Sequence, residues 1–106
     1  MTTQISIADD FSRYPVGRYL TDGPYSGERF RDEILVPALK LGQAVVDFDG
    51  GRGYGSSFLE EAFGGLVRLK IFPDEDFQER LVLKSSNESL CAEVRSYIDD
   101  ELVRSK

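Results

Sequence analysis

A glycine-rich turn followed by two serines is the stretch of this sequence in which chemistry would be expected. Residues 49–55 read Asp-Gly-Gly-Arg-Gly-Tyr-Gly, and Ser56 and Ser57 follow directly. A turn of this kind at the start of a helix often binds an anion through its backbone N–H groups. However, it lacks the Gly-Lys-Ser/Thr ending of a P-loop, and its glycines are not spaced as in a dinucleotide-binding loop. We therefore favour a flexible turn that reverses the chain over a phosphate-binding loop.

The two serines are the candidate sites of modification. Ser57 and Glu60 have the spacing of a capping box, so Ser57 is expected to cap the following helix. Ser56 is expected to be more exposed and accessible to a kinase. A phosphate there would be tolerated by the helix dipole and would add about two negative charges to a docking surface. Neither serine is expected to be a catalytic nucleophile, because the chain has no histidine and no lysine at a motif spacing.

Two aspartates offer an alternative chemistry. Asp47 and Asp49 flank the end of an expected strand, and ligands bind at the carboxyl ends of strands in parallel α/β sheets. They could act as acid and base, although no neighbouring residue would separate their pKa values. Binding of a small ligand or nucleotide by the glycine-rich turn, these aspartates and Arg18 is therefore the alternative to a protein-docking role.

Two clusters of like charge are expected to lie on the surface. Four arginines precede or begin the first long helix, and ion pairing on the surface is favoured over binding of a phosphate or an acidic partner helix: Arg13, Arg18, Arg29 and Arg31. The acidic run at residues 74–76 fits no calcium-binding loop and is expected to be solvated. No metal site and no cofactor are predicted.

The composition limits the classes of protein to be considered. A chain of 106 residues is expected to form a single domain, residues 1–106. The net charge of −6 argues against binding to nucleic acid or to an anionic membrane surface. No apolar run approaches the roughly 20 residues that span a bilayer, and the N-terminus lacks the pattern of a signal peptide. Because the one cysteine, Cys91, cannot form an internal disulfide, we expect a cytoplasmic protein.

Alternating strands and helices are expected to position these residues. Hydrophobic periodicity predicts strands at residues 4–8, 44–48 and 80–84, a further short strand at 18–20, and helices at 27–41, 57–70 and 87–103. Such alternation implies crossover connections. The predicted fold class is α/β, with a short mixed but mainly parallel sheet covered by about three helices, which can all lie on one face.

Local signals mark the ends of the predicted helices. Ser26 is expected to cap helix 27–41, Pro37 to kink or loosen its last turn, and Gly42 to end it. Ser85 and Glu88 have capping-box spacing before the last helix.

Two glycines interrupt the middle of helix 57–70. Gly64 and Gly65 each cost about 1 kcal/mol relative to alanine. Close approach of another backbone, from the sheet or from a partner, is expected to offset this cost. Glu60 and Glu61 are expected to point away from the apolar face of this helix, and Cys91 is expected to lie in the core beneath the last one.

The strand AVVDFDG at residues 44–50 and the segment GSSFLEEAFGGLV at 55–67 resemble the signature of STAS domains, the fold of sulphate transporters and anti-sigma-factor antagonists. More narrowly, the sequence is similar to the bacterial family of STAS-like domains of unknown function, over nearly the whole chain. In anti-sigma-factor antagonists this turn leads to Asp-Ser-Ser-Gly-Leu, whose first serine is phosphorylated by a GHKL-type ATPase that is also the anti-sigma factor. The resemblance implies that Ser56 is the phosphoacceptor and Ser57 its neighbour. This chain has Gly55 in place of the aspartate and Phe58 in place of the glycine.

The expected function is that of a regulatory module without catalytic activity. It would dock a protein partner, for which a GHKL-type ATPase or kinase is the candidate, through the turn at residues 50–55 and the helix that follows. Serine phosphorylation would switch this docking. A homodimer formed through helix faces is a further expectation. The residues predicted to bind the partner or an anion are Arg18, Arg52, Gly53, Tyr54, Gly55 and Glu60.

Overall fold

Three strands form one parallel sheet at the centre of the protein. The computed structural model describes residues 1–73 and 77–104 of the chain. The strands lie in the order β1-β2-β3, and their bounds are β1 (Thr2–Ser6), β2 (Gln43–Asp47) and β3 (Leu81–Lys84). In the register of the sheet, Ile5 lies opposite Val46, and Val46 lies opposite Leu83. The predicted α/β class is confirmed, and the sheet of the described residues is wholly parallel.

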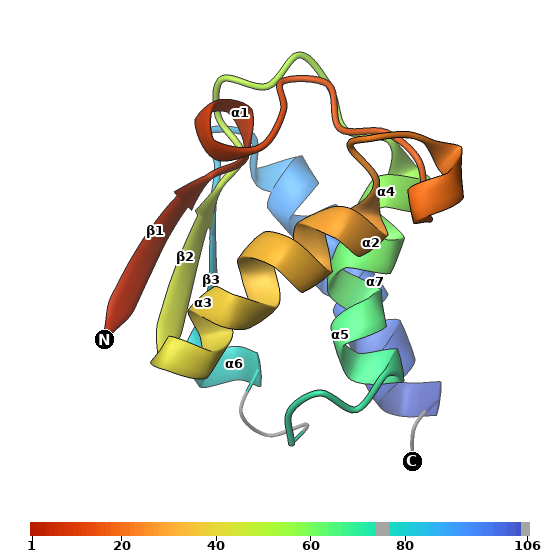
Figure 1. Ribbon diagram of the computed structural model, residues 1–106. Coiled ribbons are helices and arrows are strands. Elements are labelled where there is room, and N and C mark those ends of the chain that lie inside the picture. The colour runs from red at the N-terminus through yellow and green to blue at the C-terminus, as the bar shows by residue number, and fades with distance from the viewer. Residues whose placement is uncertain (74–76, 105–106) are drawn as a thin grey trace.

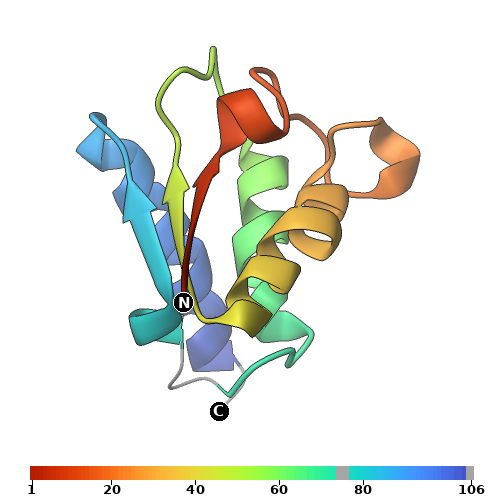
Figure 2. The ribbon, with the colours of Figure 1, turned by 60° about the vertical axis from the view of Figure 1, so that its left-hand side comes forward.

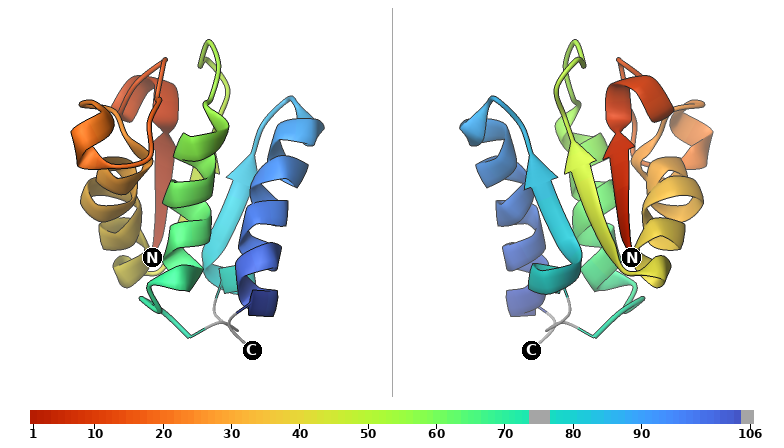
Figure 3. Two further views of the ribbon diagram at one scale, coloured as in Figure 1. Left: turned by 90° about the vertical axis from the view of Figure 1, so that its right-hand side faces the viewer. Right: turned by 90° about the vertical axis from the view of Figure 1, so that its left-hand side faces the viewer.

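Three long helical segments cover the same face of this sheet (Figures 1 and 3). Each crossover leads to the next strand in the same direction, so right-handed crossovers place their helices on one side. The first segment comprises α2 (Gly27–Phe30), η2 (Arg31–Leu35) and α3 (Val36–Leu41). The second comprises α4 (Ser56–Leu59), η3 (Glu60–Gly64) and α5 (Gly65–Arg68), and the third is α7 (Glu88–Arg104). Single turns are formed by α1 (Ile7–Asp10), η1 (Leu20–Asp22) and α6 (Phe77–Arg80).

The core lies between the sheet and these helices and is rich in phenylalanine. The rings of Phe30 and Phe58 are 5.7 Å apart between centroids, and those of Phe48 and Phe63 are likewise 5.7 Å apart. Phe63 also lies 6.2 Å from Phe30, so one aromatic cluster joins the first two helical segments to the end of β2. Aliphatic side chains fill the rest, and the fully buried ones are Ile7, Leu35, Ala44, Val46, Leu59, Ala62, Leu66, Val67 and Val94.

The strand predicted at residues 18–20 is wrong, because a local side chain satisfies the backbone there. The carboxylate Oδ2 of Asp22 accepts hydrogen bonds from the backbone N–H groups of Arg18 at 3.1 Å and Tyr19 at 2.8 Å. This favours a compact turn over a strand ladder. The first strand also ends earlier than predicted, since Ser6 caps α1 by accepting a hydrogen bond from the N–H of Asp9 at 3.2 Å.

The helix of residues 27–41 is bounded as predicted. The hydroxyl of Ser26 accepts a hydrogen bond from the backbone N–H of Arg29 at 3.2 Å, which confirms it as the cap. Gly42 ends the helix with φ of 147°, a conformation that favours glycine. Pro37 follows a π-helical turn in which the N–H of Val36 donates to the carbonyl of Arg31, so the helix widens before the proline and continues beyond it.

The last helix differs from the prediction in its cap. Asn87, not Ser85, caps α7: its side-chain oxygen accepts hydrogen bonds from the N–H groups of Ser89 at 3.0 Å and Leu90 at 3.4 Å. The hydroxyl of Ser85 instead accepts a hydrogen bond from the N–H of Asn87 at 3.0 Å. Cys91 is partly buried instead of lying in the core, and burial raises the pKa of its thiol. Within the described residues, no helix is both long and apolar enough to cross a membrane.

Candidate functional site

The glycine-rich turn rises from the end of the sheet at which the strand arrows point, beside the loop that follows α1 (Figures 1 and 2). Two backbone hydrogen bonds join the two segments. The N–H of Arg52 donates to the carbonyl of Arg13 at 2.9 Å, and the N–H of Gly55 donates to that of Pro15 at 3.5 Å. The exposed residues Arg13, Tyr14 and Val16 therefore form one surface with residues 52–55, and we call it the turn surface.

Tyr54 anchors the turn to the core. Its hydroxyl donates to the carbonyl of Phe48 at 2.5 Å, and its ring packs 5.4 Å from the ring of Phe48 and 6.4 Å from that of Phe58. Burial, followed by the charges of Asp47 and Asp49, raises the pKa of Tyr54 to about 12. The turn is thus held at its centre, whereas Arg52 and Gly53 are exposed. The expectation of a flexible turn is corrected in this respect.

Both serines lie exposed in the first turn of the following helix. The helix begins at Ser56, and Gly55 is its cap without a side-chain hydrogen bond. Ser57 is therefore not the cap, and its predicted capping box with Glu60 does not form. No hydrogen bond joins either hydroxyl to another described residue. Both hydroxyls therefore lie next to the N–H groups at the positive end of the helix dipole.

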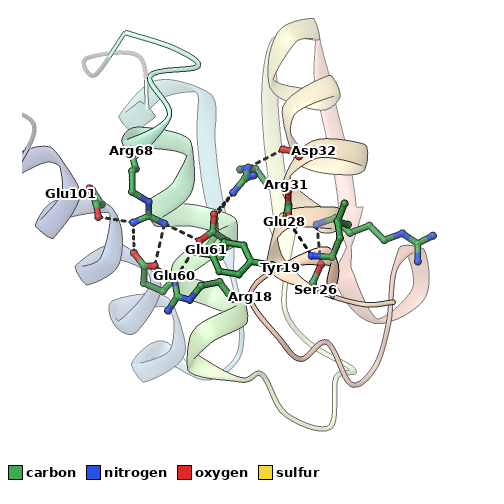
Figure 4. Close-up of polar contacts among 12 residues, drawn as sticks. Arg18, Tyr19, Ser26, Glu28, Arg31, Asp32, Glu60, Glu61, Arg68 and Glu101 are labelled. Carbon is green, nitrogen blue, oxygen red and sulfur yellow. Dashed lines mark hydrogen bonds and ion pairs between the residues drawn. The ribbon is translucent and has the colours of Figure 1, made fainter. Parts of the chain in front are cut away.

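Glu60 and Glu61 do not point into solvent but form the centre of an ion-pair cluster (Figure 4). The Nη1 atom of Arg18 contacts Glu60 and lies 3.3 Å from Glu61 Oε1. The Nη1 atom of Arg68 lies 2.9 Å from Glu60 Oε2 and 2.6 Å from Glu101 Oε1. The cluster therefore joins the loop before α2 to the second and third helical segments.

Arg31 and Glu61 form a buried ion pair within this cluster. Arg31 is 3% exposed and Glu61 is 5% exposed. The Nη1 atom of Arg31 donates to Glu61 Oε2 at 2.6 Å and to the backbone carbonyl of Glu61 at 3.1 Å. Arg68 Nη2 adds a contact to Glu61 Oε1 at 3.1 Å. Every carboxylate of this group has at least one guanidinium partner, which burial of charge requires.

The pKa values in the cluster favour the charged forms. Burial raises the pKa of Glu60, but hydrogen bonds from Arg68 and Arg18 outweigh it, and the net shift is downward. The hydrogen bond to Glu60 is the largest cause of a raised pKa for Arg18 and for Arg68. These shifts favour the ion pairs, with both arginines as cations and Glu60 as an anion at neutral pH.

The two glycines in the middle of the helix make room for these ion pairs. A Cβ atom at Gly65 would lie 2.6 Å from Arg31 Nη1, and one at Gly64 would lie 2.6 Å from Glu60 Oε2. A backbone does approach Gly64, but it belongs to α7 and not to the sheet or a partner as predicted: the carbonyl of Tyr97 would lie 3.5 Å from the added atom. At Gly65, a charged side chain approaches instead.

Of the four arginines expected to form ion pairs on the surface, Arg18 and Arg29 do so, whereas the ion pair of Arg31 with Glu61 is buried. Arg18 and Arg31 belong to the cluster, although Arg31 is buried. Arg29 pairs with Glu33 at 3.2 Å. Among the described residues, no carboxylate lies within ion-pair distance of Arg13. Sequence reasoning missed Arg68 and Glu101, and the glycine pair was the one signal that pointed to this region.

The two aspartates have separate roles at the end of β2. Asp47 Oδ1 accepts a hydrogen bond from the N–H of Asp49 at 2.9 Å. Asp49 Oδ1 accepts hydrogen bonds from the N–H of Ser86 at 2.9 Å, the hydroxyl of Ser86 at 3.0 Å and that of Ser85 at 3.3 Å. The backbone bond from Ser86 is the largest cause of a lowered pKa for Asp49. These bonds tie the glycine-rich turn to the loop after β3.

A cavity of about 340 Å³ lies between that turn and the start of α7, where Asp49, Tyr54 and Asn87 line it. Arg18 does not line this cavity; it lines another, of about 360 Å³, together with Arg68 and Arg104. The alternative site predicted from the turn, the aspartates and Arg18 is therefore divided between two places. Among residues 1–73 and 77–104, no group of three or more Asp, Glu or Cys side chains could hold a metal ion, and residues 74–76 lie outside the described residues.

A short parallel sheet with helices on one face, and a turn that leads into an exposed serine pair at a helix start, are consistent with a STAS-like α/β fold. The chain belongs to the family of STAS-like domains of unknown function (DUF4325), whose family model matches residues 26–90. The matched region runs from the cap of α2 to the first turn of α7 and includes both serines. The predicted resemblance to this family is confirmed over residues 26–90, a shorter range than the nearly whole chain that was predicted. No curated protein and no solved structure matches the chain.

Proposed function

We propose that this protein is a regulatory module without catalytic activity that docks a protein partner. The docking site comprises the turn surface and the start of the helix at Ser56. The observation that carries this proposal is the position of Ser56 and Ser57: both are exposed in a first helical turn, and neither hydroxyl is used by the fold. A surface that presents exposed hydroxyl groups, not used in hydrogen bonds within the described fold, beside exposed apolar side chains suits contact with another protein.

Serine phosphorylation would regulate this docking. A phosphate on Ser56 or Ser57 is compatible with the fold because the helix N-terminus stabilises negative charge. At the same time it would place about two charges in an interface that must lose its water, which weakens binding. The resemblance to anti-sigma-factor antagonists makes a GHKL-type ATPase or kinase the candidate partner, and that choice rests on the resemblance alone.

Copurification followed by a direct binding measurement tests the proposal. The tagged chain is used to recover partners from its source cells, and the affinity of the recovered protein is then measured by calorimetry for the wild type and for Ser56→Asp and Ser57→Asp. Ser89→Asp is the matched control, since Ser89 is exposed in the first turn of α7. We expect at least one of the first two variants to weaken binding about tenfold or more, and the control to leave it unchanged. Equal affinities for all four proteins would contradict the proposal.

The cavity beside Asp49 favours a second candidate function, the binding of a small ligand. It lies at the carboxyl ends of β2 and β3, which is the usual place of ligands in parallel sheets. A thermal-shift screen with ATP, GTP and sugar phosphates separates the two functions, because a ligand that binds only the folded state raises Tm. A rise that is abolished by Asp49→Asn would favour this candidate over protein docking.

A further inference from the structure

Large exposed apolar side chains are concentrated in the loop that precedes α2. Of the nine such residues in the described part of the chain, five lie between residues 14 and 25. They are Tyr14, Val16, Tyr19, Leu20 and Tyr25, with exposures from 43% to 63%. Tyrosine is enriched where proteins bind one another, since it buries a large area at little cost in side-chain entropy. Such a concentration marks an interaction surface.

This loop is held in one conformation before any partner arrives. The N–H of Val16 donates to the carbonyl of Tyr25 at 3.1 Å, which closes the loop at its base. The N–H of Leu20 donates to Glu28 Oε1 at 2.9 Å, and the ion pair of Arg18 with Glu60 ties the loop to the second helical segment. A surface that is already ordered loses little entropy on binding.

The part of the loop beside the glycine-rich turn carries positive charge from two arginines. Arg52 Cζ lies 5.9 Å from the centroid of the Tyr14 ring, and both residues are exposed. Within the described residues, no carboxylate lies within ion-pair distance of Arg13 or Arg52. The whole chain has a net charge of −6, so two arginines on one surface that have no carboxylate partner in the described part of the chain are a local exception.

We infer that the turn surface binds an acidic segment of the partner that also carries apolar side chains. Arg13 and Arg52 would pair with its carboxylates, while Tyr14 and Val16 would contact its apolar side chains. The inference rests on the proposed function and names the chemistry of the partner. It also explains how a phosphate would act: Gly55 contacts Val16, with a Cβ there 3.6 Å from Val16 Cγ2, so Ser56 lies at the edge of the same surface. A phosphate there would repel an acidic segment.

A peptide of simple composition tests this chemistry on the intact chain. The probe is a short fluorescein-labelled peptide of alternating glutamate and leucine, compared with the same peptide with glutamine in place of glutamate. We expect saturable binding of the glutamate peptide, weakened about fivefold or more in Arg13→Gln/Arg52→Gln. The control Lys40→Gln/Arg95→Gln removes the same charge from exposed positions elsewhere and should bind as the wild type does. Tyr14→Ser should also weaken binding.

Three outcomes would overturn the inference. They are equal binding of the two peptides, an equal loss in the control variant, and tighter binding of an oligothymidylate of the same length, which would indicate nucleic acid instead. The same variants separate this inference from the proposed function. If Ser56→Asp weakens binding of the recovered partner but Arg13→Gln/Arg52→Gln does not, the proposed docking role is supported and the inference of an acidic segment in the partner is wrong. If only the arginine variant weakens binding of the partner, docking through the turn surface is supported and regulation by serine phosphorylation is wrong.

Discussion

The guanidinium group of Arg31 occupies the space that a side chain at Gly65 would fill. A Cβ atom at Gly65 would lie 2.6 Å from Arg31 Nη1, which at the same time donates to Glu61 Oε2 at 2.6 Å. The two residues lie on neighbouring helical segments, so the glycine and the buried ion pair between those segments depend on each other.

Gly65→Ala should therefore destabilise the protein although alanine is the better helix former. Replacing glycine by alanine stabilises a helix by about 1 kcal/mol. However, the displaced Arg31 loses its buried contacts to Glu61, and the loss of these contacts costs more free energy than the helix gains. We expect a net loss of about 1–3 kcal/mol in the free energy of unfolding, measured with urea. Gly53→Ala is the control, because nothing lies within 4 Å of a Cβ atom there. An unchanged or higher stability of Gly65→Ala would show that the ion pair does not need this space.

Arg31 and Arg18 should differ in their contribution to stability. Arg31→Met leaves Glu61 buried with fewer hydrogen bonds, and we expect it to cost about 2–4 kcal/mol. Arg18→Gln should cost about 0.5–1 kcal/mol, because Arg18 is 31% exposed and its partners Glu60 and Glu61 retain Arg68. Urea unfolding of both variants checks the order. A larger loss for Arg18→Gln would mean that the loop before α2, and not the helix pair, depends most on the cluster.

Gly55→Asp should stabilise the chain. Gly55 has φ of −64° and ψ of 139°, which any residue adopts, and an added Cβ would meet only Val16 at van der Waals distance. An aspartate there can cap the helix and reduces the entropy of the unfolded chain. Together these effects are worth about 0.5–1 kcal/mol, or a rise in Tm of about 2–8 °C. A lower Tm, measured by circular dichroism, would indicate that a carboxylate beside Ser56 is not tolerated.

Tyr54 should make stability fall at high pH. Its pKa is raised from 10.0 to about 12 in the fold, so its contribution is fully present below pH 10 and is lost as the pH rises through 12. Titration of phenolate absorbance in the folded protein checks this. We expect the absorbance that develops near pH 10 to be the same in Tyr54→Phe as in the wild type, and the absorbance that develops near pH 12 to be smaller in the variant. Tyr54→Phe should also lose about 1 kcal/mol with its hydrogen bond to Phe48.

The sheet and the helices could be predicted because each depends on a local pattern. Alternating apolar residues predicted β1 and β3, and apolar residues at helical spacing predicted the segments that carry Phe30, Phe63 and Val94. The strand expected at residues 18–20 does not form, because the Asp22 carboxylate accepts hydrogen bonds from two backbone N–H groups there. A pattern of alternating side chains does not reveal this competition for the backbone.

The ion-pair cluster could not be predicted from local patterns, because its members come from distant parts of the chain. Arg18, Arg31, Glu61 and Glu101 meet only once three helical segments pack together. Adjacent glutamates opposite an apolar stripe usually indicate a solvated helix face. In this helix the π-helical turn at Glu60–Gly64 and the absence of side chains at its end allow arginines to approach instead.

The exposure of Ser56 at the start of the helix was predicted correctly, but the capping role of Ser57 was not. The spacing of Ser57 and Glu60 matches a capping box, yet Glu60 is held by Arg18 and Arg68 and cannot reach back. Ser57 is therefore left exposed as well as Ser56, which the spacing of Ser57 and Glu60 did not indicate.

The most direct test of the docking proposal is a footprint of the recovered partner on the isotope-labelled chain by amide chemical-shift mapping. We expect the largest changes on residues 13–16 and 52–57, and we expect them to disappear when Ser56 or Ser57 carries a phosphate. Changes confined to the uncovered face of the sheet, or to the cavity beside Asp49, would contradict the docking proposal.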